Sequence, residues 1–139
     1  KSVKAQEGKV QRDAFLTSSR FVIESLHSLS VDVTRLLDGD VSEKSWQAFQ
    51  RGDISVFTRK LAALGSDWPL ERAQLKFRRD AEFRTYVQRF VRQFEEIYDQ
   101  ASSNDYGALM GATIGSSDVA KLYSMLCKVA GKESKVGKI

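Results

Sequence analysis

The sequence has little of three residue types that anchor other kinds of fold: one cysteine, one histidine and one proline in 139 residues. A single cysteine excludes an internal disulfide framework. One cysteine and one histidine are too few for a zinc site, which needs roughly three or four such ligands. One proline and nine glycines fit helices better than β-hairpins. No apolar run approaches the length of about 18 residues that a membrane span requires.

What remains is the composition of a globular domain. Hydrophobic residues make up 42% of the chain and charged residues 29%, with a mean hydropathy of −0.36. This balance excludes a disordered acidic or basic tail. A chain of this length buries roughly 68% of its unfolded surface, which is enough for one core. No signal peptide is recognisable, and we therefore expect an intracellular, cytoplasmic protein.

The net charge of +4 belongs mostly to the two ends of the chain. Residues 1–12 carry +3 and residues 130–139 carry +2, so the body between them carries −1. We therefore predict basic flexible tails at 1–12 and 132–139, around a helical domain at 13–131. Within the body, residues 51–92 carry +5, whereas the segments on either side carry −3 each. A basic middle therefore lies between two acidic flanks.

Apolar periodicity predicts two long helices as the spine of the domain, over 14–37 and 81–101. In each, apolar residues recur at alternating steps near three and four, as an amphipathic helix requires. The first helix carries Phe15, Val22, Leu26, Leu29, Val33 and Leu36. The second carries Phe83, Tyr86, Val87, Phe90, Phe94, Ile97 and Tyr98.

Short polar segments divide the chain between these helices. Gly39 ends the first helix, and Asp40 with Glu43 resembles a capping box that opens a second, with Trp46 and Phe49 as its buried side. A third helix follows from an Asp53 cap to Gly65, with Val56, Phe57, Leu61 and Leu64 on its apolar face.

The remaining helix start and stop signals predict further segments. Asp67 and Pro69 open a short helix through Leu75 and Phe77, and Asp80 caps the 81–101 helix. Residues 109–114 form a short apolar stretch interrupted by glycine. The last helix opens at Ser117 or Asp118 and closes at Gly131, with Val119, Leu122, Tyr123, Leu126 and Val129 facing inward. The fold class predicted is therefore all-α, a compact bundle of about five to seven helices with two long central ones.

Few residues could carry chemistry. We expect Cys127 to pack in the core, because nothing places it in an electropositive setting that would activate a thiol. His27 is expected at a partly exposed helix position without a catalytic role. Glu95, Glu96 and Asp99 cluster at one helix end and could bind a divalent metal or transfer protons, but an ordinary ion pair of Arg92 with Glu95 or Glu96 is the simpler interpretation. The sequence therefore predicts no enzyme, no cofactor and no small-molecule substrate.

The basic middle offers a candidate binding surface. Residues 72, 76 and 79 follow steps of four and three, and residues 84 and 92 lie eight apart, so each set lines one helix face. Such a surface suits carboxylates, nucleic-acid phosphates or anionic lipid headgroups. No helix-turn-helix spacing is recognisable. The competing interpretation is a solvated face with intramolecular pairing. The candidate partner-binding residues are Arg72, Lys76, Arg79, Arg84, Arg89 and Arg92.

Four segments in order carry a resemblance to a known group of proteins. They read FVIESLHSLSVDVTRLL, SWQAFQRGDISVFTRKL, DAEFRTYVQRFVRQFEEI and SSDVAKLYSMLCKVAG. Together they resemble the C-terminal globular segment of very long alphaproteobacterial coiled-coil proteins, of the growth-pole ring and polar-landmark type. The resemblance covers about residues 14–131 and rests on hydrophobic pattern. It implies a bacterial scaffold's terminal domain that docks or self-associates at the cell pole, without a cofactor. The long heptad rod of those proteins is missing from this chain.

The sequence thus predicts a non-catalytic protein-interaction or self-association module, from a larger scaffold protein. The alternative is a nucleic-acid or anionic-membrane binder that uses the basic region 72–92. Whether the chain is a monomer or a homodimer is left open, because the wide aromatic stripe of the 81–101 helix could be covered by the other helices or by a second copy of the chain.

Overall fold

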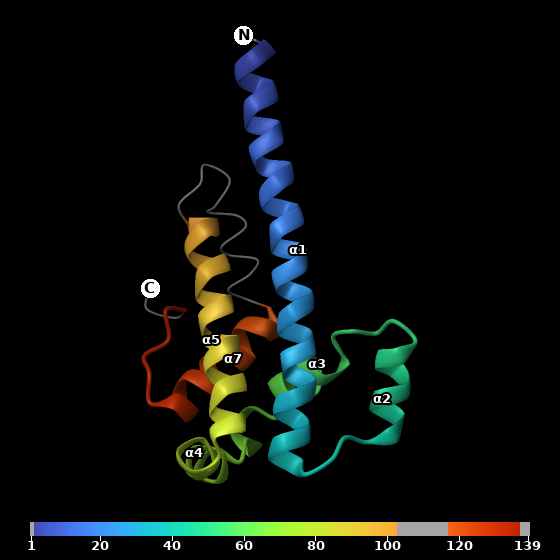
Figure 1. Cartoon of the computed structure of the whole chain (residues 1–139), viewed down its shortest axis with the longest axis vertical. Coiled ribbons are helices and arrows are strands. Elements are labelled where there is room, and N and C mark those ends of the chain that lie inside the picture. Colours follow the sequence, from blue (N-terminus) through green and yellow to red (C-terminus); the bar gives the residue numbers. More distant parts are fainter. Residues whose placement is uncertain (1, 103–116, 137–139) are drawn as a thin grey trace.

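A computed structural model describes residues 2–102 and 117–136, and side chains over 19–101 and 117–136. Within these ranges the chain forms six α-helices and one short 3-10 helix, with no strand, which confirms the predicted all-α class (Figure 1). The apolar stretch predicted at 109–114 lies outside the described residues. The helices are α1 (Ser2–Asp38), α2 (Glu43–Gln50), α3 (Val56–Ala63), α4 (Leu70–Arg79), α5 (Ala81–Ser102) and α7 (Asp118–Ala130), with η1 (Gly65–Asp67) between α3 and α4.

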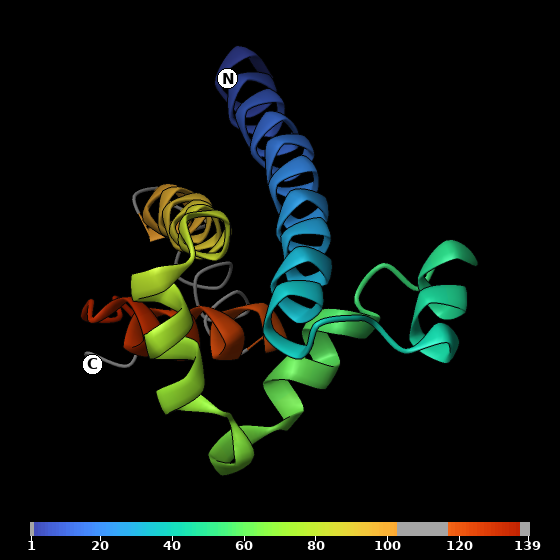
Figure 2. The same cartoon turned by 60° about the horizontal axis from the view of Figure 1, so that its bottom comes forward.

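The two predicted spine helices, α1 and α5, run side by side, and the other elements gather around their lower halves (Figures 1 and 2). Helix α7 contacts α3, α4 and α5 and closes the core. The apolar stripes predicted for these helices supply fully buried side chains, because each stripe removes a continuous apolar surface from water. The largest are Tyr123, Phe57, Phe83, Phe90, Phe94, Leu26, Ile97, Leu122 and Leu126.

The ends of α5 and α7 follow their predicted signals. The Asp80 carboxylate accepts hydrogen bonds from the backbone N–H groups of Phe83 (3.2 Å) and Glu82 (3.0 Å). These bonds, led by the one from Phe83, and the Lys76 ammonium lower the pKa of Asp80. At α7 the cap is Ser117, which accepts from the Ala120 N–H. Gly131 ends α7 in the left-handed region at φ +69°, where a residue with a Cβ would be strained.

Helix α2 differs from its prediction. Its cap is Ser42, which accepts from the Ser45 N–H, whereas Asp40 accepts from the N–H of Val41. The buried residue of the helix is Ser45, and Trp46, predicted to be buried, is 39% exposed. The physical reason is tertiary: α2 packs mainly on α3 and stands away from the rest of the domain (Figure 2). The Phe49 ring therefore reaches the buried Phe57 ring, at 5.9 Å between centres, whereas Trp46 stays exposed.

Helix α3 keeps its predicted apolar face except at its end. The cap position belongs to Ser55, and the Asp53 carboxylate instead holds the Arg59 guanidinium in a fork with bonds of 2.9 and 2.8 Å. Leu64, predicted to be inward, is 37% exposed, because η1 turns the chain away from the core directly after it.

Residues 2–12 and 132–136 are the described parts of the two segments predicted as flexible tails. Helix α1 begins at Ser2, so residues 2–12 continue the helix. At the other end, Lys132 and Lys135 form ion pairs with Glu95 (2.5 Å) and Asp99 (2.7 Å) on α5. Opposite charge therefore holds residues 132–136 on the domain. Among the described helices, none is both long and apolar enough to cross a membrane.

Candidate functional site

The six predicted basic residues divide between α4 and α5, and intramolecular contacts engage several of them. The Arg72 guanidinium lies 3.3 Å from the Asp38 carboxylate, and the Lys76 ammonium lies 3.2 Å from that of Asp80. Exposed pairs of this kind contribute little stability, about 0–1 kcal/mol. They do offset the positive charge that a phosphate-binding face would use.

Two further members of the set have structural contacts. The Arg84 guanidinium donates to the carbonyls of Phe77 (3.0 Å) and Arg78 (3.2 Å), and so satisfies acceptors at the end of α4 that have no intrahelical donor. The Arg89 guanidinium lies 5.9 Å from the centre of the Tyr86 ring, a cation–π distance.

Arg92 borders a cavity of about 480 Å³ that Glu95 and Lys132 also line. The sequence favoured an ion pair of Arg92 with Glu95 or Glu96, but among the described residues Arg92 forms no ion pair with either. Glu95 is 9% exposed, and its carboxylate accepts from the Lys132 ammonium and, at 2.7 Å, from the Tyr123 hydroxyl. A carboxylate buried to this degree needs such donors to offset its lost hydration.

The described residues contain no group of three or more His, Cys, Asp and Glu side chains that could hold a metal ion. Cys127 is buried in the core as predicted, and burial raises the pKa of its thiol. A thiol in that state is a poor nucleophile.

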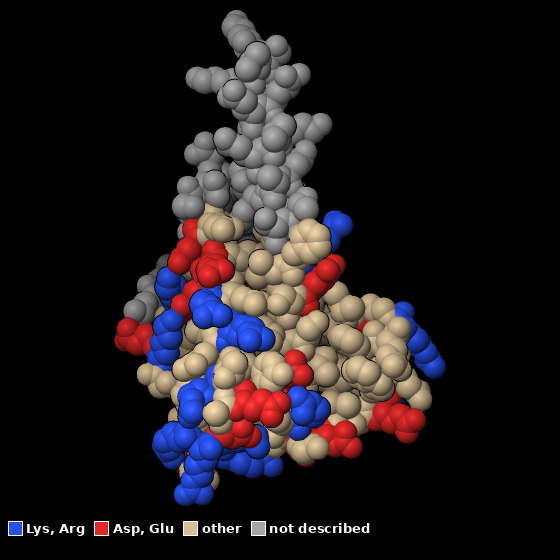
Figure 3. Space-filling view, viewed as in Figure 1, with Lys and Arg blue, Asp and Glu red and all other residues tan. Residues whose placement is uncertain are grey.

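Arg72, Arg89 and Arg92 of the predicted set are exposed, and so is the last turn of α4. Arg78 and Arg79 are exposed there and form no ion pair with a described acidic residue. Leu75 lies three and four residues before them and is 40% exposed. We call Leu75, Arg78 and Arg79 the basic end. Figure 3 shows Lys and Arg gathered over this region at the lower left. The sequence set contained Arg79 but missed Arg78, whose spacing of three from Leu75 was the available signal.

A second surface lies between α1 and α2 and was not predicted. It is a cleft of about 570 Å³, which we call the acidic cleft. Its apolar wall includes the exposed ring of Trp46, and the one cation among its described lining residues, Arg35, lies 3.5 Å from both Asp32 and Glu82. The cleft exists because α2 stands away from α1, which periodicity does not reveal. The lining residues are Val31, Asp32, Arg35, Asp40, Val41, Glu43 and Trp46.

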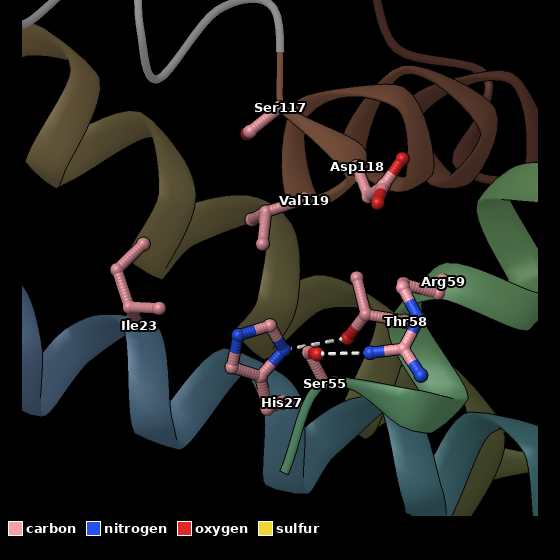
Figure 4. A pocket seen from close by; sticks show the side chains of 8 residues that line it. All are labelled: Ile23, His27, Ser55, Thr58, Arg59, Ser117, Asp118 and Val119. Carbon is pink, nitrogen blue, oxygen red and sulfur yellow. Dashed lines mark hydrogen bonds between the residues drawn. The ribbon is translucent and has the colours of Figure 1, made fainter. Parts of the chain in front are cut away.

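A third feature is a cavity of about 340 Å³ between α1, α3 and the start of α7. Figure 4 shows its eight lining side chains, with His27 at its floor. His27 is only 8% exposed, so the predicted partly exposed position is wrong. Thr58 on α3 covers the imidazole, and the two side chains are joined by a hydrogen bond of 2.8 Å.

The hydrogen bonds around Thr58 determine which nitrogen of His27 carries the proton. The Ser30 hydroxyl donates to the carbonyl of Leu26, so in its 2.8 Å bond with Thr58 the threonine hydroxyl must donate. With that proton used, Thr58 accepts from His27 Nδ1–H. The other nitrogen, Nε2, therefore carries a lone pair, and it points toward the space between Ile23 and Val119 (Figure 4).

The surroundings of this imidazole favour its neutral form. Burial lowers the pKa of His27, and the Arg59 guanidinium lowers it further, against an opposing effect of Asp53. Such an imidazole can accept a hydrogen bond at Nε2 from a small N–H or O–H group, beside two aliphatic side chains. Across the cavity, Arg59 is held in its fork with Asp53, which also lowers the pKa of that carboxyl.

Comparison with known proteins adds no information about these surfaces. No family model, curated protein or solved structure matches the chain. The basic end, the acidic cleft and the His27 cavity are the surface features of the described residues that bear most on a function.

Proposed function

We propose that this chain is a non-catalytic interaction module that binds protein and associates with copies of itself. The observation that carries the proposal is the placement of Trp46 and Leu75. Each is a large apolar side chain, 39% and 40% exposed, and each lies among charges of mainly one sign. An apolar centre with a polar rim is the usual anatomy of a protein interface.

The proposal includes the setting that the sequence resemblance implies. The domain would act as the terminal part of a longer bacterial scaffold in the cytoplasm, at the cell pole. A fluorescent fusion of the domain tests this part: a polar focus supports it, and a uniform cytoplasmic signal contradicts it.

Self-association is tested by light scattering behind size exclusion, on the full chain, from about 5 µM to about 500 µM, the range expected for a weak interface. We expect the weight-average mass to rise with concentration above the 15.6 kDa of one chain. A mass that stays at one chain across the whole range contradicts self-association.

A second candidate function is contact with an anionic surface, and the exposure of Arg78 and Arg79 beside Leu75 favours it. Phosphate contacts release counterions, so such binding falls steeply as salt rises. Co-sedimentation with phosphatidylserine vesicles, and fluorescence anisotropy with a labelled single-stranded oligonucleotide, test it. Binding that disappears in R78E/R79E supports this function, and no binding at low salt contradicts it.

A further inference from the structure

We infer that the basic end of one copy docks into the acidic cleft of a second copy, so that the chain associates head to tail. This inference rests on the proposed self-association and names its two surfaces. It pairs Leu75 with the wall formed by Trp46, and it pairs Arg78 and Arg79 with the carboxylates of the cleft.

The acidic cleft keeps two carboxylates without a cationic partner among the described residues. Asp40 accepts from the Val41 N–H at 2.8 Å, and Glu43 accepts from the Gln47 side-chain amide at 3.5 Å. Neither contact cancels the negative charge. Arg35 already lies between Asp32 and Glu82, so an incoming cation would meet uncompensated carboxylates at the α2 side of the cleft.

The basic end presents the complementary chemistry. Helix α4 carries four basic residues and one acidic residue, Glu71. Because Arg78 and Arg79 lie three and four residues after Leu75, all three side chains occupy one stretch of the helix surface. Guanidinium groups form two-pronged bonds with carboxylates, which suits them to Asp40 and Glu43. The apolar side chain between them would cover the exposed Trp46 ring.

The positions of the two surfaces select a second copy as the occupant. Helices α2 and α4 lie on opposite sides of the α1 end in both views (Figures 1 and 2), so one copy cannot bring its own basic end into its own cleft. The two surfaces match in charge sign and in having an apolar centre. Because they are different surfaces, the contact is heterologous: each copy keeps one of each, and assembly continues to a ring or an open chain.

Two variants separate the surfaces. R78E/R79E reverses the charge of the basic end. D40N/E43K reverses that of the cleft, and the amide introduced by D40N still offers an oxygen to the Val41 N–H. The matched control is R20E/K44E, which changes the net charge as much as R78E/R79E does but involves exposed residues that do not line the cleft. Far-UV circular dichroism and thermal melting establish that each variant folds.

Sedimentation velocity of each protein alone and of their mixtures then measures how strongly the copies associate. We expect each surface variant to bind itself at least about tenfold more weakly than the unaltered chain, since the charges facing each other become alike. The control should associate normally. An equimolar mixture of the two surface variants should regain association, because the intact cleft of one meets the intact basic end of the other and the two reversed surfaces also carry opposite charge.

The failures are distinguishable. If the unaltered chain stays monomeric, the proposed self-association and this inference both fail. If it associates but the surface variants associate equally well, or if both variants are monomeric and their mixture is too, the head-to-tail contact is wrong while self-association stands.

Discussion

Replacing Tyr123 by phenylalanine removes one buried oxygen on which the C-terminal segment depends. The hydroxyl donates to the Glu95 carboxylate at 2.7 Å and accepts from the Lys135 backbone N–H at 2.9 Å. The ring itself is fully buried and stacks on Phe94 at 4.3 Å between centres, so Y123F keeps the packing. The substitution therefore isolates the two hydrogen bonds.

The expected cost follows from what each partner loses. A hydrogen bond to a charged group contributes about 1.5–3 kcal/mol, and the bond from a backbone N–H contributes about 1 kcal/mol. Glu95 keeps its Lys132 partner, which limits the loss. We predict that Y123F lowers the free energy of unfolding by about 2–4 kcal/mol. For a domain of this size that corresponds to a fall in Tm of roughly 6–15 °C.

Urea unfolding followed by circular dichroism measures the free energy, and amide hydrogen exchange at Lys135 reports the local contact. The matched control is Y86F, because the structure gives the half-buried Tyr86 a ring contact with Arg89 but no hydrogen bond from its hydroxyl to a described residue. Y86F should change the free energy by less than about 0.5 kcal/mol. A Y123F cost equally small, with unchanged exchange at Lys135, refutes the assigned role of the Tyr123 hydroxyl.

Three further predictions follow from the described contacts. Because the pKa of His27 is lowered below its ordinary 6.5, the unfolded chain binds more protons than the folded chain at acid pH. The contribution of His27 to the free energy of unfolding is therefore fully present above pH 6.5 and falls as the pH drops below it, by at most about 1.4 kcal/mol per pH unit. Urea unfolding of the unaltered chain and of H27Q at several pH values measures this, and an equal loss of unfolding free energy in both proteins at acid pH would contradict it. S117A removes the α7 cap and should cost about 1 kcal/mol in the same assay, whereas S28A, at an exposed position of α1, should cost almost nothing. The Cys127 thiol should react with Ellman's reagent only as fast as the domain opens, so a rate near that of the urea-unfolded chain would show that the thiol is accessible.

The long helices were predictable because their information is local. In α5 and α7 apolar and polar positions alternate at helical spacing along the whole helix. Asp80 caps the start of α5, and Ser117 and Gly131 mark the two ends of α7. The buried face of helix α2 was harder to predict. Trp46 and Phe49 share a face at helical spacing, but whether that face is buried depends on where α3 holds the helix, and the spacing within α2 carries no such information.

The candidate sites depended even more on long-range pairing. Spacings of three and four predicted a pair of Arg92 with Glu95 or Glu96, but Glu95 is buried beside Lys132, a partner 37 residues away. His27 is buried because Thr58, on another helix, lies against it. The acidic cleft is formed by residues from α1 and α2 together with the connection between them, so no single amphipathic pattern marks it.

The most direct test of the interaction account uses the two tryptophans of the chain as reporters. Trp46 lies in the acidic cleft, whereas the indole N–H of Trp68 is buried and donates to the Leu61 carbonyl at 2.8 Å. In a dilution series followed by ¹H–¹⁵N NMR, the account predicts that the Trp46 indole signal and the amides of Leu75, Arg78 and Arg79 shift together while the Trp68 indole signal stays fixed. Signals that do not change with concentration, or shifts that leave out both Trp46 and the end of α4, would contradict it.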